Sequence, residues 1–180
     1  MREPDPEIVD RARAGDLLAF ASLVRDYQVD VWRFAYHLTR NRTLADDVTQ
    51  DAFLRAFRSI ATYRGQAKFS SWLLRITRNC AIDAYRRTRH ETVVAFDNDP
   101  EAAIQSGTAA SDERLRIEAA IKRLPMELRE PFVAIEVLGF SYQEASAVLG
   151  MKIGTVKSRM FRARAFLMRE LTEGGRADEV

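Results

Sequence analysis

The segment FSYQEASAVLGMKIGTV, residues 140–156, carries the clearest structural signature in this sequence of 180 residues. Ser141 and Glu144 stand three positions apart at its start, a spacing typical of a capping box, in which both side chains bind free amides of the first helical turn. Gly150 supplies a tight turn, and a second helical pattern follows it. Helix, glycine turn and second helix together predict a helix-turn-helix, a motif that reads DNA.

The second helix of this motif combines an apolar stripe with a basic outer face. The stripe repeats at steps of three and four residues and is expected to pack on the rest of the unit: Val156, Met160, Ala163, Leu167 and Leu171. A polar, aromatic and basic set points away from the stripe or lies on its flanks: Lys157, Ser158, Arg159, Phe161, Arg162 and Arg164. Such a face can neutralise phosphates and contact guanine edges. A lone basic helix is more simply interpreted as a solvated surface, but the capped helix and the turn before it favour DNA binding.

A helix with two unlike faces is predicted from Asp46 to Ile60, and Thr43, three residues before Asp46, marks its start. One side of this helix is small and apolar, with Val48, Ala52 and Ala56. The other side mixes acids with a leucine: Asp47, Gln50, Asp51, Leu54 and Arg58. An exposed leucine among acids suits docking on a basic partner helix, although acids in a first turn are also favoured by the helix dipole in any protein.

Residues 63–89 combine aromatic side chains with arginine and lysine. Ser70 or Ser71 is the predicted cap of a helix whose inner side holds Leu73, Ile76, Thr77 and Cys80. The outer side of that helix is largely basic: Arg75, Arg78, Asn79, Ile82, Arg86 and Arg89. The loop before the helix, residues 63–69, adds further aromatics and bases: Tyr63, Arg64, Lys68 and Phe69. Aromatic faces interleaved with arginines can stack unpaired bases and hold a single strand, whereas Tyr63 and Trp72, each taken alone, are equally expected in the core.

Helical periodicity dominates the whole chain, and alternating runs bounded by hairpin turns are not found, so the predicted fold class is all-α. Residues 92–112 are mostly small, polar or acidic, have no sustained apolar stripe and no lysine or arginine, and are predicted to form a flexible linker. They separate two small helical units, residues 6–91 and 113–173, each of which carries a basic patch. The sequence therefore predicts two helical domains joined by an acidic tether.

The composition excludes several classes of protein. With 47% hydrophobic and 30% charged residues, the chain is globular rather than disordered. Its apolar runs are too short to span a membrane and no signal segment opens it, so a cytoplasmic protein is predicted. Cys80 has no disulfide partner, and His37 and His90 lack neighbours at metal-ligand spacing, so neither metal nor cofactor is predicted. Without a nucleophile–base pair or a glycine-rich phosphate loop, we expect no catalytic residue, no small-molecule substrate and no enzyme.

Three segments, taken in order, resemble one family, the extracytoplasmic-function sigma factors of bacterial RNA polymerase. ADDVTQDAFLRAF at 45–57 looks like the family's polymerase-binding helix, and FSSWLLRITRN at 69–79 looks like its promoter-melting segment. GTVKSRMFRAR at 154–164 looks like its recognition helix. With the linker, the resemblance covers nearly the whole chain. It implies a sigma-two-like domain at 6–91 and a sigma-four-like domain at 113–173.

This resemblance also implies roles for individual residues. Core polymerase would be bound by Asp46, Asp47, Gln50, Asp51, Leu54 and Arg58. The minus-ten element would be contacted and opened by Tyr63, Arg64, Lys68, Phe69, Trp72, Arg75, Arg78, Asn79 and Arg86. The minus-thirty-five element would be read by Tyr142, Gln143, Thr155, Lys157, Ser158, Arg159, Phe161 and Arg162.

The partners implied by the resemblance are core RNA polymerase, through its beta-prime clamp helices and beta flap, and promoter DNA. An anti-sigma factor is a further implied partner, and it would hold the chain inactive, in some relatives at the inner face of the membrane. The alternative function is that of a stand-alone helix-turn-helix regulator, which would bind its site as a dimer. That alternative gives no role to the acidic face or to the aromatic loop. Binding to core polymerase would distinguish a sigma factor from a stand-alone regulator.

Overall fold

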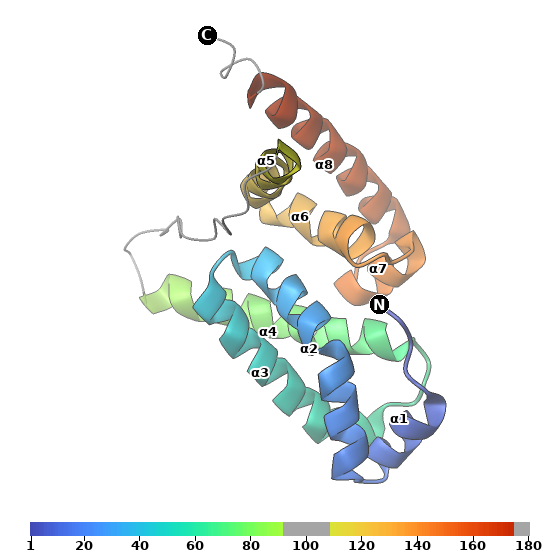
Figure 1. Cartoon of the computed structure of the whole chain (residues 1–180). Helices are drawn as coiled ribbons and strands as arrows, with labels where there is room; N and C mark the ends of the chain where they lie inside the picture. The colour runs from blue at the N-terminus through green and yellow to red at the C-terminus, as the bar shows by residue number, and fades with distance from the viewer. Residues whose placement is uncertain (92–108, 175–180) are drawn as a thin grey trace.

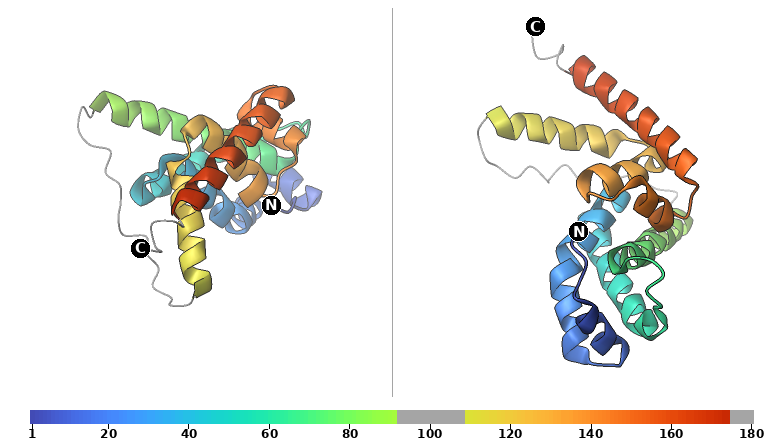
Figure 2. Two further views of the ribbon diagram at one scale, coloured as in Figure 1. Left: turned by 90° about the horizontal axis from the view of Figure 1, so that it is seen from above. Right: turned by 90° about the vertical axis from the view of Figure 1, so that its right-hand side faces the viewer.

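The computed structural model of the chain describes residues 1–91 and 109–174. Within these residues every regular element is helical, which confirms the predicted all-α class. Figures 1 and 2 show two helical bundles, one formed by α1 to α4 and the other by α5 to α8, with the second lying on one end of the first. Helices α1 to α4 form the first unit, and helices α5 to α8 form the second unit.

The first unit contains α1 (Pro6–Arg13), α2 (Leu17–Thr39), α3 (Arg42–Ser59), a single turn of 3-10 helix (Ile60–Thr62) and α4 (Phe69–Glu91). Three long helices, α2 to α4, pack on one another around large buried side chains that include Leu23, Phe34 and Leu73. The lone cysteine, Cys80, lies in this core on α4. Burial of apolar side chains from all three helices is what stabilises the bundle.

Two helix starts in the first unit differ from the prediction. Helix α3 begins one residue before Thr43, because the side chain of Asn41 accepts a hydrogen bond from the Leu44 amide at 2.8 Å and serves as the cap. Helix α4 begins at Phe69, so Ser70 and Ser71 lie inside the helix and do not cap it. The carboxylate of Glu3 accepts hydrogen bonds from the first amides of α4 instead. Sequence patterns do not predict this pairing, because Glu3 is 66 residues from Phe69.

The second unit contains α5 (Ala109–Arg123), α6 (Met126–Phe132), a π-helical turn (Val133–Val137), α7 (Tyr142–Leu149) and α8 (Ile153–Gly174). The break between α5 and α6 falls at Pro125, because a proline disfavours helix at the residue before it. Pro131 sits inside α6 just before the π turn. A proline cannot donate to the helical ladder, so the backbone around it rearranges.

The helix-turn-helix is confirmed in detail. Ser141 and Glu144 form the predicted capping box at the start of α7. Gly150 ends α7 with φ 63°, in the left-handed region that favours glycine. On α8 the predicted apolar stripe is buried at Val156, Met160, Ala163 and Leu167, and Leu171 is half-buried. The outer face of α8 is therefore the one that the sequence predicted.

The two units are in direct contact. Helix α7 packs against α4, and α6 packs against α2, as Figures 1 and 2 show. The predicted linker, residues 92–112, lies mostly outside the described residues, and α5 already begins at Ala109, four residues before the predicted start of the second unit. The sequence predicted two tethered units and did not predict that they pack together.

Candidate nucleic-acid and partner interfaces

The recognition face of α8, defined here as Lys157, Ser158, Phe161 and Arg162, is exposed to solvent along the outer side of the helix. Phe161 leaves 76% of its surface exposed, an unusual position for a large apolar side chain. Arg162 makes no hydrogen bond or ion pair within the part of the chain that the structure describes. Its five guanidinium donors are free to bind an external acceptor.

Other residues predicted for the second DNA surface are less accessible. Arg159 is half-buried and donates to the carbonyl oxygen of Glu127 at 3.3 Å. Thr155 and Tyr142 are also half-buried, whereas Gln143 is exposed in the first turn of α7. The accessible positions therefore lie on the second and third turns of α8 and at the start of α7, where a helix-turn-helix meets DNA.

A small groove of about 260 Å³ adjoins the recognition face, between α6 and α8. Its lining mixes apolar side chains with two arginines: Leu128, Phe161, Arg162, Ala165, Phe166 and Arg169. The guanidinium of Arg169 lies over the ring of Phe166, 5.5 Å from its centroid. The exposed aromatic surface of α8 thus continues into a basic groove.

The docking face of α3 is the side predicted to bind polymerase: Asp47, Gln50, Asp51, Leu54 and Arg58. The opposite side is buried as predicted, with Val48, Ala52 and Ala56 in the core. Leu54 is 48% exposed and is flanked by exposed Gln50 and Arg58. An exposed leucine surrounded by polar side chains is a suitable anchor for a partner helix.

Two acids predicted for the same surface are bound to neighbours in the first unit. Asp46 accepts a hydrogen bond from the indole nitrogen of Trp32 at 2.6 Å. Asp51 pairs with Arg55 at 2.9 Å, and Arg55 reaches across to Asp83 on α4, also at 2.9 Å. Hydrogen bonds to Asp83 and Asp51 raise the pKa of Arg55. Arg55 therefore ties α3 to α4, a role that its sequence position did not reveal.

The aromatic-basic loop, residues 63–68, rests on a cluster of rings. Tyr63, Phe69 and Trp72 contact one another with ring centroids 5.1 to 5.8 Å apart, and Phe69 also packs on Tyr27. The Tyr63 hydroxyl donates to the carbonyl oxygen of Ala67 at 2.6 Å and closes the loop on itself. Phe69 is buried, whereas Tyr63 and Trp72 are half-buried, so the structure places Phe69 beneath the loop as its support.

The basic face of α4 is largely accessible. Arg75, Asn79 and Arg86 are exposed and fall on one side of the helix, and Arg64 is exposed on the loop beside it. The inner side of α4 is buried as predicted at Leu73, Thr77 and Cys80. The exposed arginines of α4, together with Arg64 on the preceding loop, are therefore accessible to a phosphate backbone.

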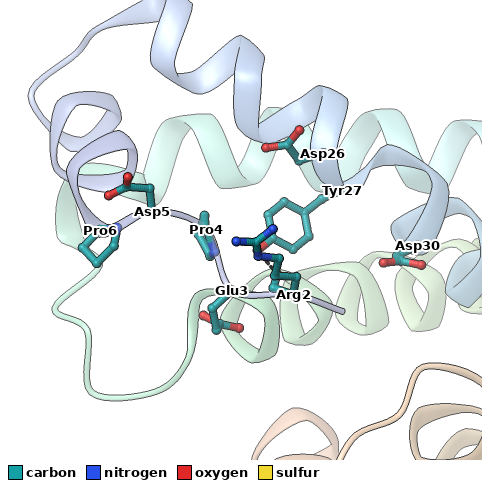
Figure 3. A pocket seen from close by; sticks show the side chains of 8 residues that line it. All are labelled: Arg2, Glu3, Pro4, Asp5, Pro6, Asp26, Tyr27 and Asp30. Carbon is teal, nitrogen blue, oxygen red and sulfur yellow. Dashed lines mark hydrogen bonds between the residues drawn. The ribbon is translucent and has the colours of Figure 1, made fainter.

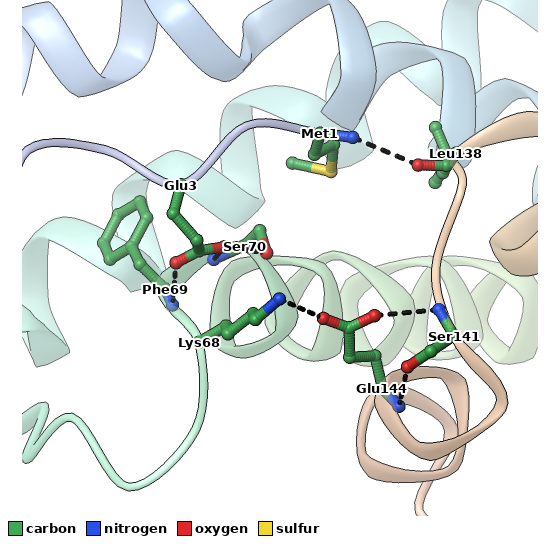
Figure 4. Close-up of polar contacts among 8 residues, drawn as sticks. All are labelled: Met1, Glu3, Lys68, Phe69, Ser70, Leu138, Ser141 and Glu144. Atoms are coloured by element: carbon green, nitrogen blue, oxygen red, sulfur yellow. Dashed lines mark hydrogen bonds and ion pairs between the residues drawn. The ribbon is translucent and has the colours of Figure 1, made fainter.

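Two of the predicted minus-ten cations, Lys68 and Arg78, are bound by acids of the second unit. The Lys68 ammonium lies 2.6 Å from Oε1 of Glu144, as Figure 4 shows. Both Nε and Nη2 of Arg78 donate to the carboxylate of Glu130, each at 3.1 Å. Glu130 is 4% exposed, and no pattern in the sequence pointed to it as a partner of Arg78.

The carboxylate of Glu144 binds two partners at once. One oxygen binds Lys68, and the other accepts from the Ser141 amide at 2.8 Å in the capping box (Figure 4). The hydrogen bond from Lys68 and the backbone amide of Ser141 lower the pKa of Glu144 to about 2. The capping role was predicted from the Ser141 spacing, whereas the contact with Lys68 was not, because those two residues lie far apart in sequence.

A larger open pocket of about 750 Å³ lies between the N-terminal segment and α2 (Figure 3). Its walls are residues 2–6 together with Asp26, Tyr27 and Asp30. Glu3, Asp5, Asp26 and Asp30 make it predominantly acidic, and Arg2 is the basic residue among them. An acidic pocket repels phosphate, so it is not part of either predicted DNA surface.

Among residues 1–91 and 109–174, no group of three or more acidic, histidine or cysteine side chains is placed to hold a metal ion. Within the same residues, no helix is both long and apolar enough to cross a bilayer.

Two family models match most of the chain. The model of Sigma-70 region 2 matches residues 23–91, and the model of Sigma-70, region 4, matches residues 114–167. The first match lies in the first unit and contains the docking face, the loop and the α4 arginines. The second contains α7 and most of α8.

Curated proteins similar to this chain agree with the family models. The ECF RNA polymerase sigma factor SigM of Mycobacterium tuberculosis is 39% identical over 168 residues, covering 93% of this chain and 84% of the relative. The RNA polymerase sigma-H factor of Pseudomonas aeruginosa is 34% identical, covering 91% of each chain.

Solved structures show the same fold. CnrH, in complex with the cytosolic domain of CnrY, matches with a TM-score of 0.71 and 30% identity over 92% of this chain and 96% of CnrH. The sigma factor RpoE, in complex with the anti-sigma factor NepR from Bartonella quintana, matches with a TM-score of 0.70 and 26% identity over 85% of this chain and 96% of RpoE.

Proposed function

Because the chain belongs to the extracytoplasmic-function sigma factors of bacterial RNA polymerase, we propose how its two units divide the work of that family. The chain binds core polymerase and directs promoter-specific initiation. The first unit docks on core through the α3 docking face and opens the minus-ten element through the aromatic-basic loop and the α4 arginines. The second unit reads the minus-thirty-five element through the recognition face of α8.

The observation that carries this division is the accessibility of the recognition face behind a complete helix-turn-helix. Lys157, Ser158 and Arg162 are exposed while Val156 and Met160 are buried on the opposite side. Only a helix held by its apolar stripe can present its polar side to a groove in a fixed orientation. Arg162, free of internal partners, is the side chain best suited to a bidentate contact with guanine.

In the first unit we assign separate tasks to neighbouring surfaces. Leu54, with Asp47, Gln50 and Arg58, anchors the clamp helices of the largest polymerase subunit, and Asp46 and Asp51 support that face from its edge. Tyr63 and Trp72 supply ring surface at the loop, where a base leaving the stack is held. Arg64, Lys68, Arg75, Arg78, Asn79 and Arg86 follow the backbone of the opened strand. Phe69 keeps the loop in place from below.

The mechanism is physical rather than chemical. Polymerase holds both units at fixed positions, so each unit binds its element at a raised effective concentration. Sigma factors are not catalysts as a family, and we propose that phosphodiester chemistry belongs wholly to core. We further propose that the chain acts in the cytoplasm, where the beta flap of polymerase contacts the second unit. An anti-sigma factor restrains the free chain, as the complexes of CnrH and RpoE suggest by similarity.

Reconstituted transcription tests the proposal. Purified chain and core polymerase, incubated with a genomic promoter library, are expected to give transcripts whose upstream sequences share two elements at constant spacing. Core alone should give none of them. If the folded chain binds DNA fragments without core and never stimulates initiation with it, the chain works instead as a stand-alone regulator.

A further inference from the structure

The N-terminal segment, residues 1–5, passes beside the start of α4 (Figure 4). The carboxylate of Glu3 accepts hydrogen bonds from the Phe69 amide at 2.8 Å and from the Ser70 amide at 3.3 Å. The hydroxyl of Ser70 donates to the same carboxylate. One side chain from the beginning of the sequence therefore binds three donors at the first turn of α4.

This contact supplies a charge that α4 lacks. The first turn of α4, residues 69–72, contains no acid of its own. A carboxylate at this end of a helix satisfies free amides and interacts favourably with the helix dipole. Phe69 and Ser70 are buried and Glu3 is half-buried, so water competes little for these hydrogen bonds.

The N-terminal segment is itself fixed to α2. The hydroxyl of Tyr27 donates to the carbonyl oxygen of Arg2 at 2.6 Å, and Figure 3 shows the two residues side by side. Tyr27 is buried, and its ring packs on Phe69 with the ring centroids 5.4 Å apart. The backbone next to Glu3 is thus anchored to the same aromatic cluster whose amide Glu3 binds.

This anchor lies at the base of the aromatic-basic loop. The ring of Phe69 contacts those of Tyr63 and Trp72, with centroids 5.8 and 5.5 Å apart. Burial, and then the charge of Glu3, raise the pKa of Tyr63, in keeping with a carboxylate close to that ring. A shift of Phe69 would therefore move both rings that we assign to base capture.

Loss of the anchor would affect the loop more than the fold. Residues 64–68 are exposed, so their order depends on the two ends of the loop. One end follows Ile60, which is buried, and the other is Phe69. Helix ends fray more readily than helix centres, and local openings of this kind leave the rest of a bundle folded. Without Glu3, the first turn of α4 is the part expected to loosen.

We propose that Glu3 is a positioning residue for promoter opening. It acts through Phe69 and keeps the rings of Tyr63 and Trp72 in the orientation that receives a base leaving the stack. Ring surface that is already ordered does not have to be ordered at the moment of capture, which favours binding. This proposal rests on the assignment of the loop to the minus-ten element and adds to it a residue that does not touch DNA.

Two substitutions of Glu3 and a matched control test the proposal in the full chain, assembled with core polymerase. Glu3→Ala removes both acceptor oxygens, whereas Glu3→Gln keeps one. The control, Asp16→Ala, removes a carboxylate that also accepts from two successive amides, those of Leu18 and Ala19 at the start of α2. It should cost at least as much stability, because Asp16 also pairs with Arg11. Circular dichroism and co-purification with core establish that each variant is folded and docks.

The first measurement is the rate of opening of a duplex promoter selected by the holoenzyme. Fluorescence of 2-aminopurine placed in the minus-ten element reports the opening. At saturating holoenzyme, Glu3→Ala should open the promoter about fivefold more slowly than the unaltered chain, the factor that corresponds to about 1 kcal/mol. Glu3→Gln should fall between them, and Asp16→Ala should match the unaltered chain. Equal rates for Glu3→Ala and Asp16→Ala would overturn the proposal.

The second measurement uses a premelted promoter, in which the minus-ten strands are left unpaired. At saturating holoenzyme all chains should initiate equally on it, because no opening step remains. A Glu3→Ala defect of the same size on both templates would mean that Glu3 only supports the fold, which also contradicts a positioning role.

The unaltered chain separates this proposal from the function itself. If its holoenzyme opens no duplex promoter, the proposed function fails and the role of Glu3 fails with it. If it opens the promoter and Glu3→Ala opens it equally fast, only the positioning role is lost.

Discussion

His37 shows how much a single residue depends on packing that the sequence does not display. It lies near the end of α2, and burial, with the neighbouring cations Arg129, Arg33 and Lys122, lowers its pKa to about 4 against the opposing effect of Glu118. Arg129, Lys122 and Glu118 all belong to the second unit. From sequence, His37 was notable only for lacking metal-binding neighbours.

The pKa of His37 predicts a pH dependence of stability. Between pH 4 and 6.5 the unfolded chain binds a proton at this site that the folded chain does not. The contribution to stability is therefore complete above pH 6.5 and is lost as the pH falls toward 4, by at most about 3 kcal/mol. Urea denaturation across this pH range should show that His37→Gln loses less stability on acidification than the unaltered chain. An equal loss of stability in the two chains would show that His37 does not account for it.

Arg162 carries a prediction about DNA discrimination. Replacing it by alanine should weaken binding to the minus-thirty-five element by roughly 1 to 3 kcal/mol, because a bidentate base contact is lost. The measurement is holoenzyme affinity for a promoter and for the same promoter with that element substituted. The penalty should be present on the first and absent on the second. An equal penalty on both would mean that Arg162 contacts only phosphates.

At the level of helices, the apolar periodicity predicted which side of each helix is buried, but the sequence did not predict where α3 and α4 begin. The buried sides of α3, α4 and α8 are those indicated by the apolar steps, because the helical repeat fixes which side chains share a face. The start of α4 was missed because its cap, Glu3, is more than sixty residues away in the chain. The sequence favoured Thr43 as the cap of α3, but the cap is Asn41. Both residue types cap helices, and only the three-dimensional structure shows which one does so here.

Glu3 can be tested as the cap of α4. Its carboxylate accepts from the Phe69 amide at 2.8 Å and from the amide and hydroxyl of Ser70 (Figure 4). Glu3→Ala should lower the free energy of unfolding by about 1 kcal/mol, the usual contribution of a capping side chain. Glu3→Gln keeps one acceptor oxygen and should lose less. Chemical denaturation measures both, and equal stability of all three chains would refute the capping role.

The docking face of α3 can be tested in the same way. Leu54→Asp should abolish co-purification with core polymerase while leaving the thermal melt nearly unchanged, because Leu54 is 48% exposed and lies outside the buried core. Val29→Asp, at an exposed valine on α2 outside that face, is the matched control and should retain binding. Retained binding by Leu54→Asp would place the polymerase contact elsewhere.

At the level of the whole molecule, the sequence predicted two units and a tether but not their association. The contacts between the two units join residues far apart in the chain, such as Arg78 and Glu130, and no short-range pattern encodes such pairs. The same limit applies to site residues. Exposure of Arg162 and Leu54 follows from helical phase, whereas the capture of Lys68 and Arg78 follows only from the packing of one unit on the other.

Salt should act on this packing. The pair formed by Lys68 and Glu144 is partly exposed, with 59% and 22% of the two side chains accessible, so mobile ions screen it. Raising the salt concentration from about 0.1 M to about 1 M shortens the screening length from about 10 Å to about 3 Å. The radius of gyration of the free chain should increase over that range, and that of the Glu130→Gln, Glu144→Gln chain should change less. An unchanged radius in the unaltered chain would show that these ion pairs do not hold the units together.

The burial of Cys80 has a practical consequence for such measurements. It is the one cysteine in the sequence, it lies in the core of α4, and burial raises the pKa of its thiol to about 12. A thiol that is both shielded and protonated reacts slowly with maleimides. Cysteines introduced at surface sites on each unit can therefore be labelled selectively in the native background. Spectroscopic rulers can then follow the separation between the units as polymerase is added.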